Sequence, residues 1–334
     1  MKCLVTGAAG FIGSHLCEAL ILQGFQVVGI DDFSVGRKSN LDQLKLNSNF
    51  ELKECDIRIE SEVSNLDSSF DYVFHLAALA DIVPSMISPK KYLDVNVTGT
   101  VNILEKCKSM KLKKFLYAAS SSCYGIPKHY PTNESSEISA EYPYALSKYL
   151  GEECVLHWSK VFKIPAVSLR LFNVFGPRVR TSGTYGAVFG VFLAQRLAGK
   201  PLTVVGDGRQ TRDFTYVTDV VDAFVSAAMS DVQNEIYNVG SGGSYSINQL
   251  VTLLGGDRVT IPKRPGEPEC TFADITKIKL SLGWQPKINF EQGVNNMLKH
   301  IDSWRDAPVW TTETIEKETR LWFHYLAERD SENL

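Results

Sequence analysis

Short apolar runs alternate with longer segments along the first half of the chain. Between the apolar runs lie segments suited to helices, at residues 12–23, 96–109 and 145–162. Because strands that alternate with helices form βαβ units, this pattern predicts an α/β fold with a parallel sheet. The runs with the length and character of buried strands are residues 2–6, 26–30, 50–55, 72–76, 115–119 and 166–171.

The pattern changes near Gly176, where loops punctuated by glycine and proline replace the regular alternation. Helical segments such as 187–198 and 219–229 remain between these loops. The change indicates a smaller second lobe at the carboxyl ends of the strands, where open α/β sheets bind ligands. The expected domains are a dinucleotide-binding domain over 1–175 with returning segments at about 215–238, a mainly substrate-binding lobe over 176–300, and a helical tail over 301–334.

The tail combines large apolar side chains with interspersed Glu and Lys, which predicts an amphipathic helix packed on the body of the protein. A partner-binding role is the alternative. The apolar residues that carry this prediction are Trp304, Trp310, Ile315, Trp322 and Leu326.

The bulk composition limits the class of protein. A hydrophobic content of 44% and a charged content of 22% are typical of a soluble globular chain. The formal charge of -3 gives no basic field for nucleic acid or for an anionic membrane. No apolar run approaches the ~18 residues that a membrane-spanning helix needs. We therefore expect neither nucleic acid nor a membrane as a partner.

Cysteine usage and the amino terminus bear on the compartment. The seven cysteines are scattered without a CxxC pair, which favours reduced thiols over disulfides. The six histidines show no metal-binding spacing, so no metal site is expected. The chain passes from Met1-Lys2 directly into a predicted strand and has no signal-peptide core. These features predict a cytoplasmic protein.

A glycine loop follows the first predicted strand and opens a helix. Gly7, Gly10 and Gly13 permit a tight turn and bring the amides of a helix N-terminus close to a pyrophosphate. Phe11 and Ile12 complete the loop. A glycine triplet alone would also suit an ordinary strand–helix turn. Its position nevertheless predicts the cofactor loop of a Rossmann-type, doubly wound parallel sheet.

Asp31 directly follows the next predicted strand, 18 residues after Gly13. A carboxylate at that point accepts hydrogen bonds from the adenosine ribose and repels a 2′-phosphate, so the predicted cofactor is NAD. Arg37 is the residue that would allow NADP instead, and Asp32 is the weaker candidate for the ribose contact.

Tyr144 and Lys148 are four residues apart and share one face of a predicted helix. Such a pair also occurs on ordinary surface helices. Ser120 follows the strand 115–119, at the edge of the sheet where chemistry takes place in such folds. Capping of the strand end is the alternative role for Ser121 and Ser122.

These three residues together predict acid–base chemistry. A tyrosine has an ordinary pKa of about 10, too high for a base at neutral pH. A lysine ammonium and a positive nicotinamide ring would both lower this pKa. Tyr144 could then take a proton from a substrate hydroxyl while NAD takes a hydride from the same carbon, and Ser120 would hold the oxygen.

Over about residues 1–300, an ordered series of motifs resembles the extended short-chain dehydrogenase/reductase family, and within it the NAD-dependent UDP-glucose and UDP-N-acetylglucosamine 4-epimerases. The matching residues are 7–13, 56–57, 75–78, 96, 99–100, 120–125, 144, 148, 170–176, 206–208, 211–214 and 264–267.

The resemblance implies further cofactor residues beyond the glycine loop and Asp31. Asp56 and its neighbour Ile57 contact the adenine. Residues 76–78 line the pyrophosphate and ribose. Simple close packing of small side chains is the alternative for 76–78. The implied cofactor residues are Asp56, Ile57, Leu76, Ala77, Ala78, Asn96, Tyr144 and Lys148.

The resemblance also implies a nucleotide-sugar site and a homodimer. Asn173 reaches the substrate phosphates, and Arg212 and Arg264 clamp them, because each guanidinium offers a planar fork of donors. Ser120 and Ser122 lie at the substrate. Family members commonly dimerise through the helices that match 96–109 and 145–162.

Two departures sharpen the implied reaction. The family's dehydratases carry acids at the positions of Ser121 and Ser122, so their absence argues for epimerisation. Thr271 aligns with a gate position beside the sugar where hexose-restricted epimerases carry a bulky tyrosine. The smaller residue leaves room for an N-acetyl group, although Thr271 could also simply fill the wall.

The sequence therefore predicts an NAD-dependent isomerase that inverts C4 of a UDP-hexose, with a preference for a UDP-N-acetylhexosamine such as UDP-GlcNAc, through a transient 4-keto sugar. Supply of polysaccharide precursors is the matching role. Another sugar-nucleotide epimerase or a 4-ketoreductase is the alternative among enzymes. A non-catalytic NAD(H)-sensing or scaffold protein is the alternative of a different class.

Overall fold

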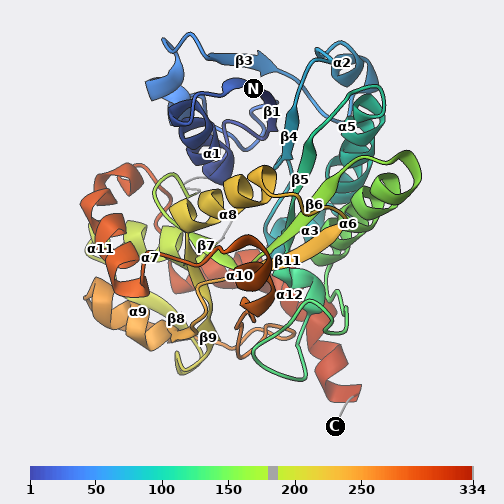
Figure 1. Cartoon of the computed structure of the whole chain (residues 1–334). Helices are drawn as coiled ribbons and strands as arrows, with labels where there is room; N and C mark the ends of the chain where they lie inside the picture. Colours follow the sequence, from blue (N-terminus) through green and yellow to red (C-terminus); the bar gives the residue numbers. More distant parts are fainter. Residues whose placement is uncertain (180–186, 333–334) are drawn as a thin grey trace.

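The structure, a computed structural model, describes residues 1–179 and 187–332, the last six of them as backbone only. Within these ranges, seven parallel strands form the central sheet in the order β11-β6-β5-β4-β1-β2-β3 (Figure 1). The strands are β1 (Lys2–Thr6), β2 (Gln26–Asp31), β3 (Phe50–Glu54), β4 (Tyr72–His75), β5 (Lys114–Ser120), β6 (Ala166–Leu171) and β11 (Glu235–Val239). All six predicted strands are present, each within one residue of its expected ends.

The direction of the strand order reverses beside β1. Chain order runs outward through β2 and β3 on one side and through β4, β5 and β6 on the other. In open α/β sheets this switch point creates a crevice at the carboxyl ends of the strands. The fold is the Rossmann-type doubly wound sheet that the alternation predicts.

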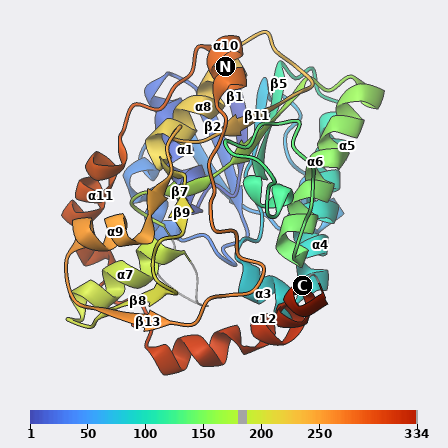
Figure 2. The ribbon, with the colours of Figure 1, turned by 90° about the horizontal axis from the view of Figure 1, so that it is seen from below.

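Helices cover both faces of the sheet. Helices α1 (Phe11–Leu22) and α8 (Val217–Met229) pack together on one face, and α5 (Thr100–Cys107) and α6 (Pro143–Phe162) pack together on the other (Figures 1 and 2). Each face has its own hydrophobic cluster, which includes Leu16 and Phe224 on the α1 side, and Ile103 and Val155 on the α6 side. Burial on both sides explains why most of the strands are nearly continuous apolar runs, whereas the edge strand β3 is more exposed and carries charged residues.

The segment predicted as one helix over 96–109 is more complex. It begins as a π-helical turn, η2 (Asp94–Gly99), and continues as α5. π-Helical turns insert an extra residue and are frequent at functional sites. Here the turn carries Asn96, which is 1% exposed and bonded to the backbone of Leu79.

Beyond β6, short strands pair in twos outside the central sheet: β7 (Asn173–Phe175) with β10 (Phe214–Tyr216), β8 (Leu202–Val205) with β13 (Arg258–Ile261), and β9 (Thr211–Arg212) with β12 (Tyr245–Ser246). All of these strands except β9 contribute to a further hydrophobic cluster, that of the second lobe and here called the second cluster, together with α7 (Val188–Leu197), α9 (Ile247–Leu254) and α11 (Phe290–Lys299). Stacked rings join the pieces, since Phe175 lies 4.5 Å from Phe189 and Phe214 lies 5.2 Å from Phe290, centroid to centroid.

The last described helix is α12 (Thr312–Glu332), which matches the amphipathic helix expected for the tail, although Trp304 and Trp310 lie before it. Its buried face consists of Ile315, Thr319, Trp322 and Leu326. The last two pack against Val83 of α3 (Ile82–Ile87), and Figure 2 shows α12 beside α3. Within the described ranges, no helix has both the length and the apolar character that crossing a bilayer would require.

Candidate active site

A cavity of about 660 Å³ opens at the carboxyl ends of the central strands. On the sheet side it is lined by residues that follow or end a strand, namely Gly7, Leu76 and Ser120. The opposite wall comes from the second cluster and from the loop that carries Arg264. The cavity therefore lies at the edge that the switch point predicts.

The glycine loop allows two backbone segments to approach closely. Gly7 has a φ of +68°, and a Cβ atom there would lie 2.8 Å from the amide nitrogen of Ala77. A Cβ on Gly13 would lie 2.1 Å from the carbonyl oxygen of Gly7. The hydroxyl of Thr6 accepts hydrogen bonds from the amides of Leu76 and Ala77 and so fixes the segment 76–78. This cradle brings the N-terminus of α1 to the cavity, where a pyrophosphate fits.

Asp31 lies beside this cradle and is 6% exposed. One carboxylate oxygen accepts a hydrogen bond from the amide of Ala9 and the other from the amide of Phe33, both at 2.9 Å. Burial raises the pKa of Asp31, and the two backbone bonds oppose that rise. Each oxygen retains acceptor capacity toward the cavity, which fits the paired hydroxyls of a ribose.

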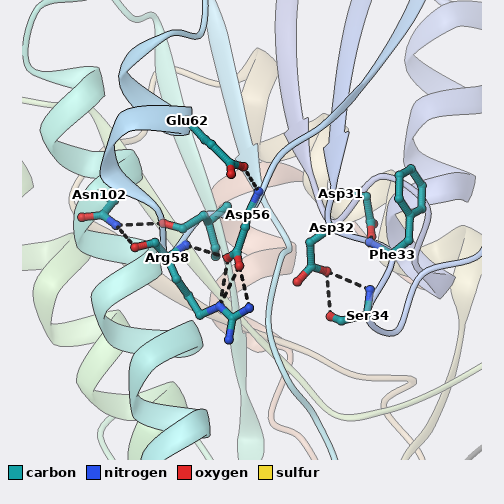
Figure 3. Close-up of polar contacts among 9 residues, drawn as sticks. Asp31, Asp32, Phe33, Ser34, Asp56, Arg58, Glu62 and Asn102 are labelled. Atoms are coloured by element: carbon teal, nitrogen blue, oxygen red, sulfur yellow. Dashed lines mark hydrogen bonds and ion pairs between the residues drawn. The ribbon is translucent and has the colours of Figure 1, made fainter.

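Asp56 lies on the neighbouring loop, after β3, and both loops appear in Figure 3. Its carboxylate binds the guanidinium of Arg58 through Nε at 2.9 Å and Nη2 at 2.5 Å. This hydrogen bonding lowers the pKa of Asp56. The Asp56 amide donates to Glu62, and Asn102 donates to the carbonyl oxygen of Ile57 at 2.8 Å. The loop is thus fixed, with Asp56 and Ile57 facing the cavity.

Tyr144 and Ser120 meet across the cavity floor. The phenol of Tyr144, in the first turn of α6, donates a hydrogen bond of 3.3 Å to the hydroxyl of Ser120, which ends β5. The hydroxyls of Ser120 and Ser122 are 2.8 Å apart. The Tyr144 ring stacks on Tyr142 with centroids 6.4 Å apart, and its edge meets Tyr92 at 6.3 Å. The tyrosine is therefore held in one orientation.

Lys148 lies one turn further along α6 and is 5% exposed. Burial lowers the pKa of its ammonium to about 7, and Glu152 partly opposes this shift. The ammonium lies 4.4 Å from the centre of the Tyr117 ring, a favourable cation–π geometry. Glu152 itself binds Arg170 at 2.5 Å in a buried ion pair.

The pKa of Tyr144 differs from the expectation that Lys148 lowers it. Burial raises the pKa of this phenol, and the hydrogen bond from Tyr144 to Ser120 opposes the rise. The reason is desolvation, which disfavours a buried phenolate and disfavours the neighbouring ammonium as well.

The opposite wall carries two arginines joined by one carboxylate. Glu267 binds Arg212 at 2.8 Å and Arg264 at 3.5 Å. Nearby, the Thr271 hydroxyl donates to the side-chain oxygen of Asn173 at 2.7 Å. It also accepts a hydrogen bond from the Asp213 amide at 3.0 Å. With its oxygen so engaged, Asn173 presents its amide nitrogen as a donor, as a phosphate site requires.

The structure gathers nearly all the predicted site residues around one cavity. The exception is Asn96, which is absent from the lining. Its side chain donates to the Leu79 carbonyl oxygen and to the Ser147 hydroxyl, both at 2.9 Å, and accepts from the Leu79 amide. It thereby ties the segment after β4 to α6. The lining residues are Gly7, Gly10, Phe11, Ile12, Gly13, Asp31, Asp56, Ile57, Leu76, Ala77, Ala78, Ser120, Ser122, Tyr144, Lys148, Asn173, Arg212, Arg264 and Thr271.

Several lining residues were not among the predicted site residues. Tyr142 could have been found, because it lies two residues before Tyr144, and Glu267 because it lies three residues after Arg264. Asp81 and Trp322 also line the cavity, and no local motif marks them. Asp81 has a φ of +78° immediately before α3, and its charge raises the pKa of Tyr144.

Known proteins resemble the chain over most of its length. A UDP-glucose 4-epimerase of Mycolicibacterium smegmatis is 35% identical over 303 residues, 88% of this chain and 96% of that protein. A UDP-glucuronic acid 4-epimerase of Bacillus cereus, solved with UDP-glucuronic acid and NAD, superposes with a TM-score of 0.85 at 36% identity, covering 91% and 99% of the two chains. A UDP-N-acetylglucosamine 4-epimerase of Methanobrevibacter ruminantium, solved with UDP-N-acetylmuramic acid, gives a TM-score of 0.85 at 32% identity, covering 90% and 98%.

The model of the NAD dependent epimerase/dehydratase family matches residues 3–240, a span that contains the glycine loop, Asp31, Ser120, Tyr144 and Lys148. With this match and relatives of similar length, the chain belongs to the NAD-dependent epimerase/dehydratase family, as an enzyme of the extended short-chain dehydrogenase/reductase type.

Proposed function

We propose that the protein inverts C4 of a UDP-hexose and prefers a UDP-N-acetylhexosamine. The observation that carries this proposal is the hydrogen bond between Tyr144 and Ser120 in the same cavity as the clamp of Arg212, Glu267 and Arg264. The first pair suits proton transfer at a secondary hydroxyl, and the second suits a diphosphate. The relatives named above act on UDP-sugars, which supports uridine as the base.

The cofactor half of the cavity fits NAD. The cradle at Gly7, the helix N-terminus of α1 and the buried Asp31 match a pyrophosphate followed by a ribose. When bound there, NAD accepts a hydride from the sugar carbon, returns it, and through its positive ring favours the phenolate form of a neighbouring tyrosine.

The protein's own residues handle the proton and the oxygen. Tyr144 takes the proton of the C4 hydroxyl, and Ser120 donates a hydrogen bond to that oxygen as it becomes a carbonyl. Ser122, 2.8 Å from Ser120, keeps the serine hydroxyl oriented. Lys148 is buried one turn further along the helix, where it would hold the ribose of a bound NAD and, when charged, would favour the phenolate form of Tyr144. Tyr144 returns the proton once the keto sugar has turned its other face.

This reaction requires a sugar that turns between two half-reactions. The nucleotide end is therefore held firmly, by Arg212, Arg264 and Asn173, and the sugar end loosely. Return of a hydride to the opposite face of C4, with reprotonation of its oxygen by Tyr144, would then give the C4 epimer while the diphosphate stays anchored.

The preference for an N-acetyl group rests on Thr271. Its hydroxyl is committed to Asn173 and Asp213, so a short side chain faces the cavity. A tyrosine at this position would fill the space that an acetamido group occupies. The similarity to the Methanobrevibacter ruminantium enzyme solved with UDP-N-acetylmuramic acid supports such a pocket.

The test is to incubate the purified protein with UDP-GlcNAc, UDP-glucose and UDP-glucuronate in separate tubes, with no added cofactor, and to follow the products by proton NMR. We expect the galacto epimer in the UDP-GlcNAc tube first. Conversion of UDP-glucuronate alone would overturn the substrate preference, and no conversion in any tube, with NAD bound, would overturn 4-epimerisation of UDP-sugars.

We also propose a cytoplasmic homodimer that supplies polysaccharide precursors, with the cofactor domain, substrate lobe and helical tail divided as the sequence predicts. Helix α6 exposes Leu146, Leu150, Val161 and Phe162 at 36–50% of their surface, which suits an intersubunit contact. Light scattering should give twice the chain mass of 37.2 kDa for the wild-type protein. A Leu150→Glu variant should give the mass of a single chain.

A further inference from the structure

Part of the cavity wall comes from the C-terminal tail. Ala307, Pro308 and Trp310 line it before α12, and Trp322 lines it from within α12. The motif match that suggested the function ends near residue 300, so these side chains lie outside the motifs. The tail therefore contributes to the site in a manner that the family motifs do not describe.

Trp322 contacts the loop that carries Arg264. Its indole N–H donates a hydrogen bond of 2.7 Å to the carbonyl oxygen of Pro265, the next residue. The guanidinium of Arg264 lies 5.5 Å from the centre of the indole ring, within the range of a cation–π interaction. Trp322 is 3% exposed, so both contacts are shielded from water.

Trp322 also packs against α3. It forms a hydrophobic cluster with Leu326 of α12 and Val83 of α3. Helix α3 directly follows Asp81, and both Asp81 and Val83 line the cavity. Trp322 therefore joins the loop of the arginine clamp to the segment that follows β4.

The clamp loop needs such a contact. Residues 262–268, between β13 and α10 (Thr276–Leu282), contain no helix or strand. A loop without regular secondary structure takes its position from side-chain contacts. Without such contacts the loop would have to become ordered when the ligand binds, and the free-energy cost of that ordering would weaken affinity. Trp322 binds the loop backbone next to Arg264 and also faces its guanidinium, so it holds both the loop and the charge.

We infer that Trp322 is a positioning residue for Arg264 and that α12 completes the nucleotide-diphosphate site. The inference rests on the proposed function only in taking a nucleoside diphosphate as the ligand. The indole pre-organises the guanidinium for the diphosphate, so its loss weakens nucleotide binding and leaves the chemistry at Tyr144 intact.

The test compares Trp322→Ala and Trp322→Phe with Tyr325→Ala, a truncation on the same helix at a side chain that is 55% exposed. UDP, GDP, CDP and dTDP are each titrated by calorimetry into NAD-loaded protein. For the diphosphate that wild-type protein binds, we expect the Kd of Trp322→Ala to rise about tenfold and that of Tyr325→Ala to stay unchanged. KM for the nucleotide sugar should rise in parallel, with kcat and bound NAD preserved.

An unchanged Kd in a folded Trp322→Ala protein would overturn the inference and leave the proposed function standing. Preference of the wild-type protein for a base other than uracil would overturn the UDP part of the proposed function, while the variants would still test Trp322 with that nucleotide. If Trp322→Ala fails to fold, Trp322→Phe decides, because it keeps a ring and loses the N–H: a rise of about threefold supports the inference, and an unchanged Kd overturns it.

Discussion

The phenol of Tyr144 donates its hydrogen bond to the hydroxyl of Ser120 across 3.3 Å, joining the first turn of α6 to the end of β5. Two elements on adjacent parts of the fold thus bring a proton acceptor and an oxygen-binding group to one point. Replacing Tyr144 by Phe should lower kcat by a factor of about 10²–10⁴, because a positioned acid–base group contributes on that scale.

Bound NAD should be unchanged in Tyr144→Phe, which absorbance of the denatured protein will measure. Tyr149→Phe, in the same helix and outside the cavity lining, is the matched control and should retain full activity. A Tyr144→Phe enzyme with more than a tenth of wild-type kcat would contradict the assigned role.

Lys148 should make the protein less stable at neutral than at alkaline pH. Its pKa falls from the usual 10.5 to about 7 on folding, so the unfolded chain binds more protons between these two values. Stability contributed by this group therefore rises as pH increases from about 7 to 10.5. Lys148→Met should remove the penalty and raise the free energy of unfolding at pH 7 by about 1–3 kcal/mol, while abolishing activity.

Urea denaturation of cofactor-free protein at pH 7 and pH 9.5 will measure this effect. The stability difference between Lys148→Met and the wild type should shrink at the higher pH. A variant that is less stable than the wild type at pH 7 would show that the contact with Tyr117 outweighs the cost of burial.

The ion pair of Glu152 and Arg170 should be costly to break. Both side chains are at most 4% exposed, and Glu152 also accepts a hydrogen bond from Ser168. Glu152→Gln leaves Arg170 buried without its counter-charge and should lower the free energy of unfolding by about 3–5 kcal/mol. Glu153→Gln, its exposed neighbour, should have almost no effect in the same urea titration.

Arg212 should govern affinity for the diphosphate. It is 7% exposed and binds Glu267 at 2.8 Å, so Arg212→Ala removes a pre-oriented donor fork from the cavity. The Kd for UDP should rise by a factor of about 10–100. Arg209→Ala, on the exposed loop before β9, is the control. Equal calorimetric affinities for the two variants would exclude Arg212 from the phosphate site.

Thr271 should set the choice of sugar. In Thr271→Tyr, the ratio of kcat/KM for UDP-GlcNAc over that for UDP-glucose should fall by about tenfold or more, because the ring occupies the acetamido space. Thr271→Val removes only the hydroxyl and its bonds to Asn173 and Asp213. Its ratio should stay close to that of the wild type, and a large fall there would assign the effect to the lost hydrogen bonds.

Six of the seven strands of the central sheet were predictable from sequence, because most of them are buried on both faces; β11 was not predicted. Residues 2–6 and 166–171 match β1 and β6 at both ends. The paired short strands beyond β6 have two to four residues each, too short to leave an apolar period. The shape of the second cluster therefore depends on contacts among distant segments, such as Phe214 with Phe290.

The candidate site, too, could be predicted from sequence only in part. The residues that follow strands, such as Gly7 and Ser120, could be found from their positions. Trp322 reaches the cavity through the packing of α12 on α3, which no spacing in the sequence encodes. The pKa of Tyr144 could not be predicted either, since its direction depends on burial, and the sequence argument considered only neighbouring charges.

The position of Glu267 between Arg212 and Arg264 also has an electrostatic consequence. Two guanidiniums and one carboxylate leave this clamp with a single net positive charge, fewer than a diphosphate carries with the opposite sign. Ligand affinity then depends more on directed hydrogen bonds than on long-range attraction, and it should weaken only gently with salt. Since the two epimers carry the same diphosphate, such a clamp binds both alike and should give them similar KM values, so the enzyme can run in either direction without strong inhibition by its product.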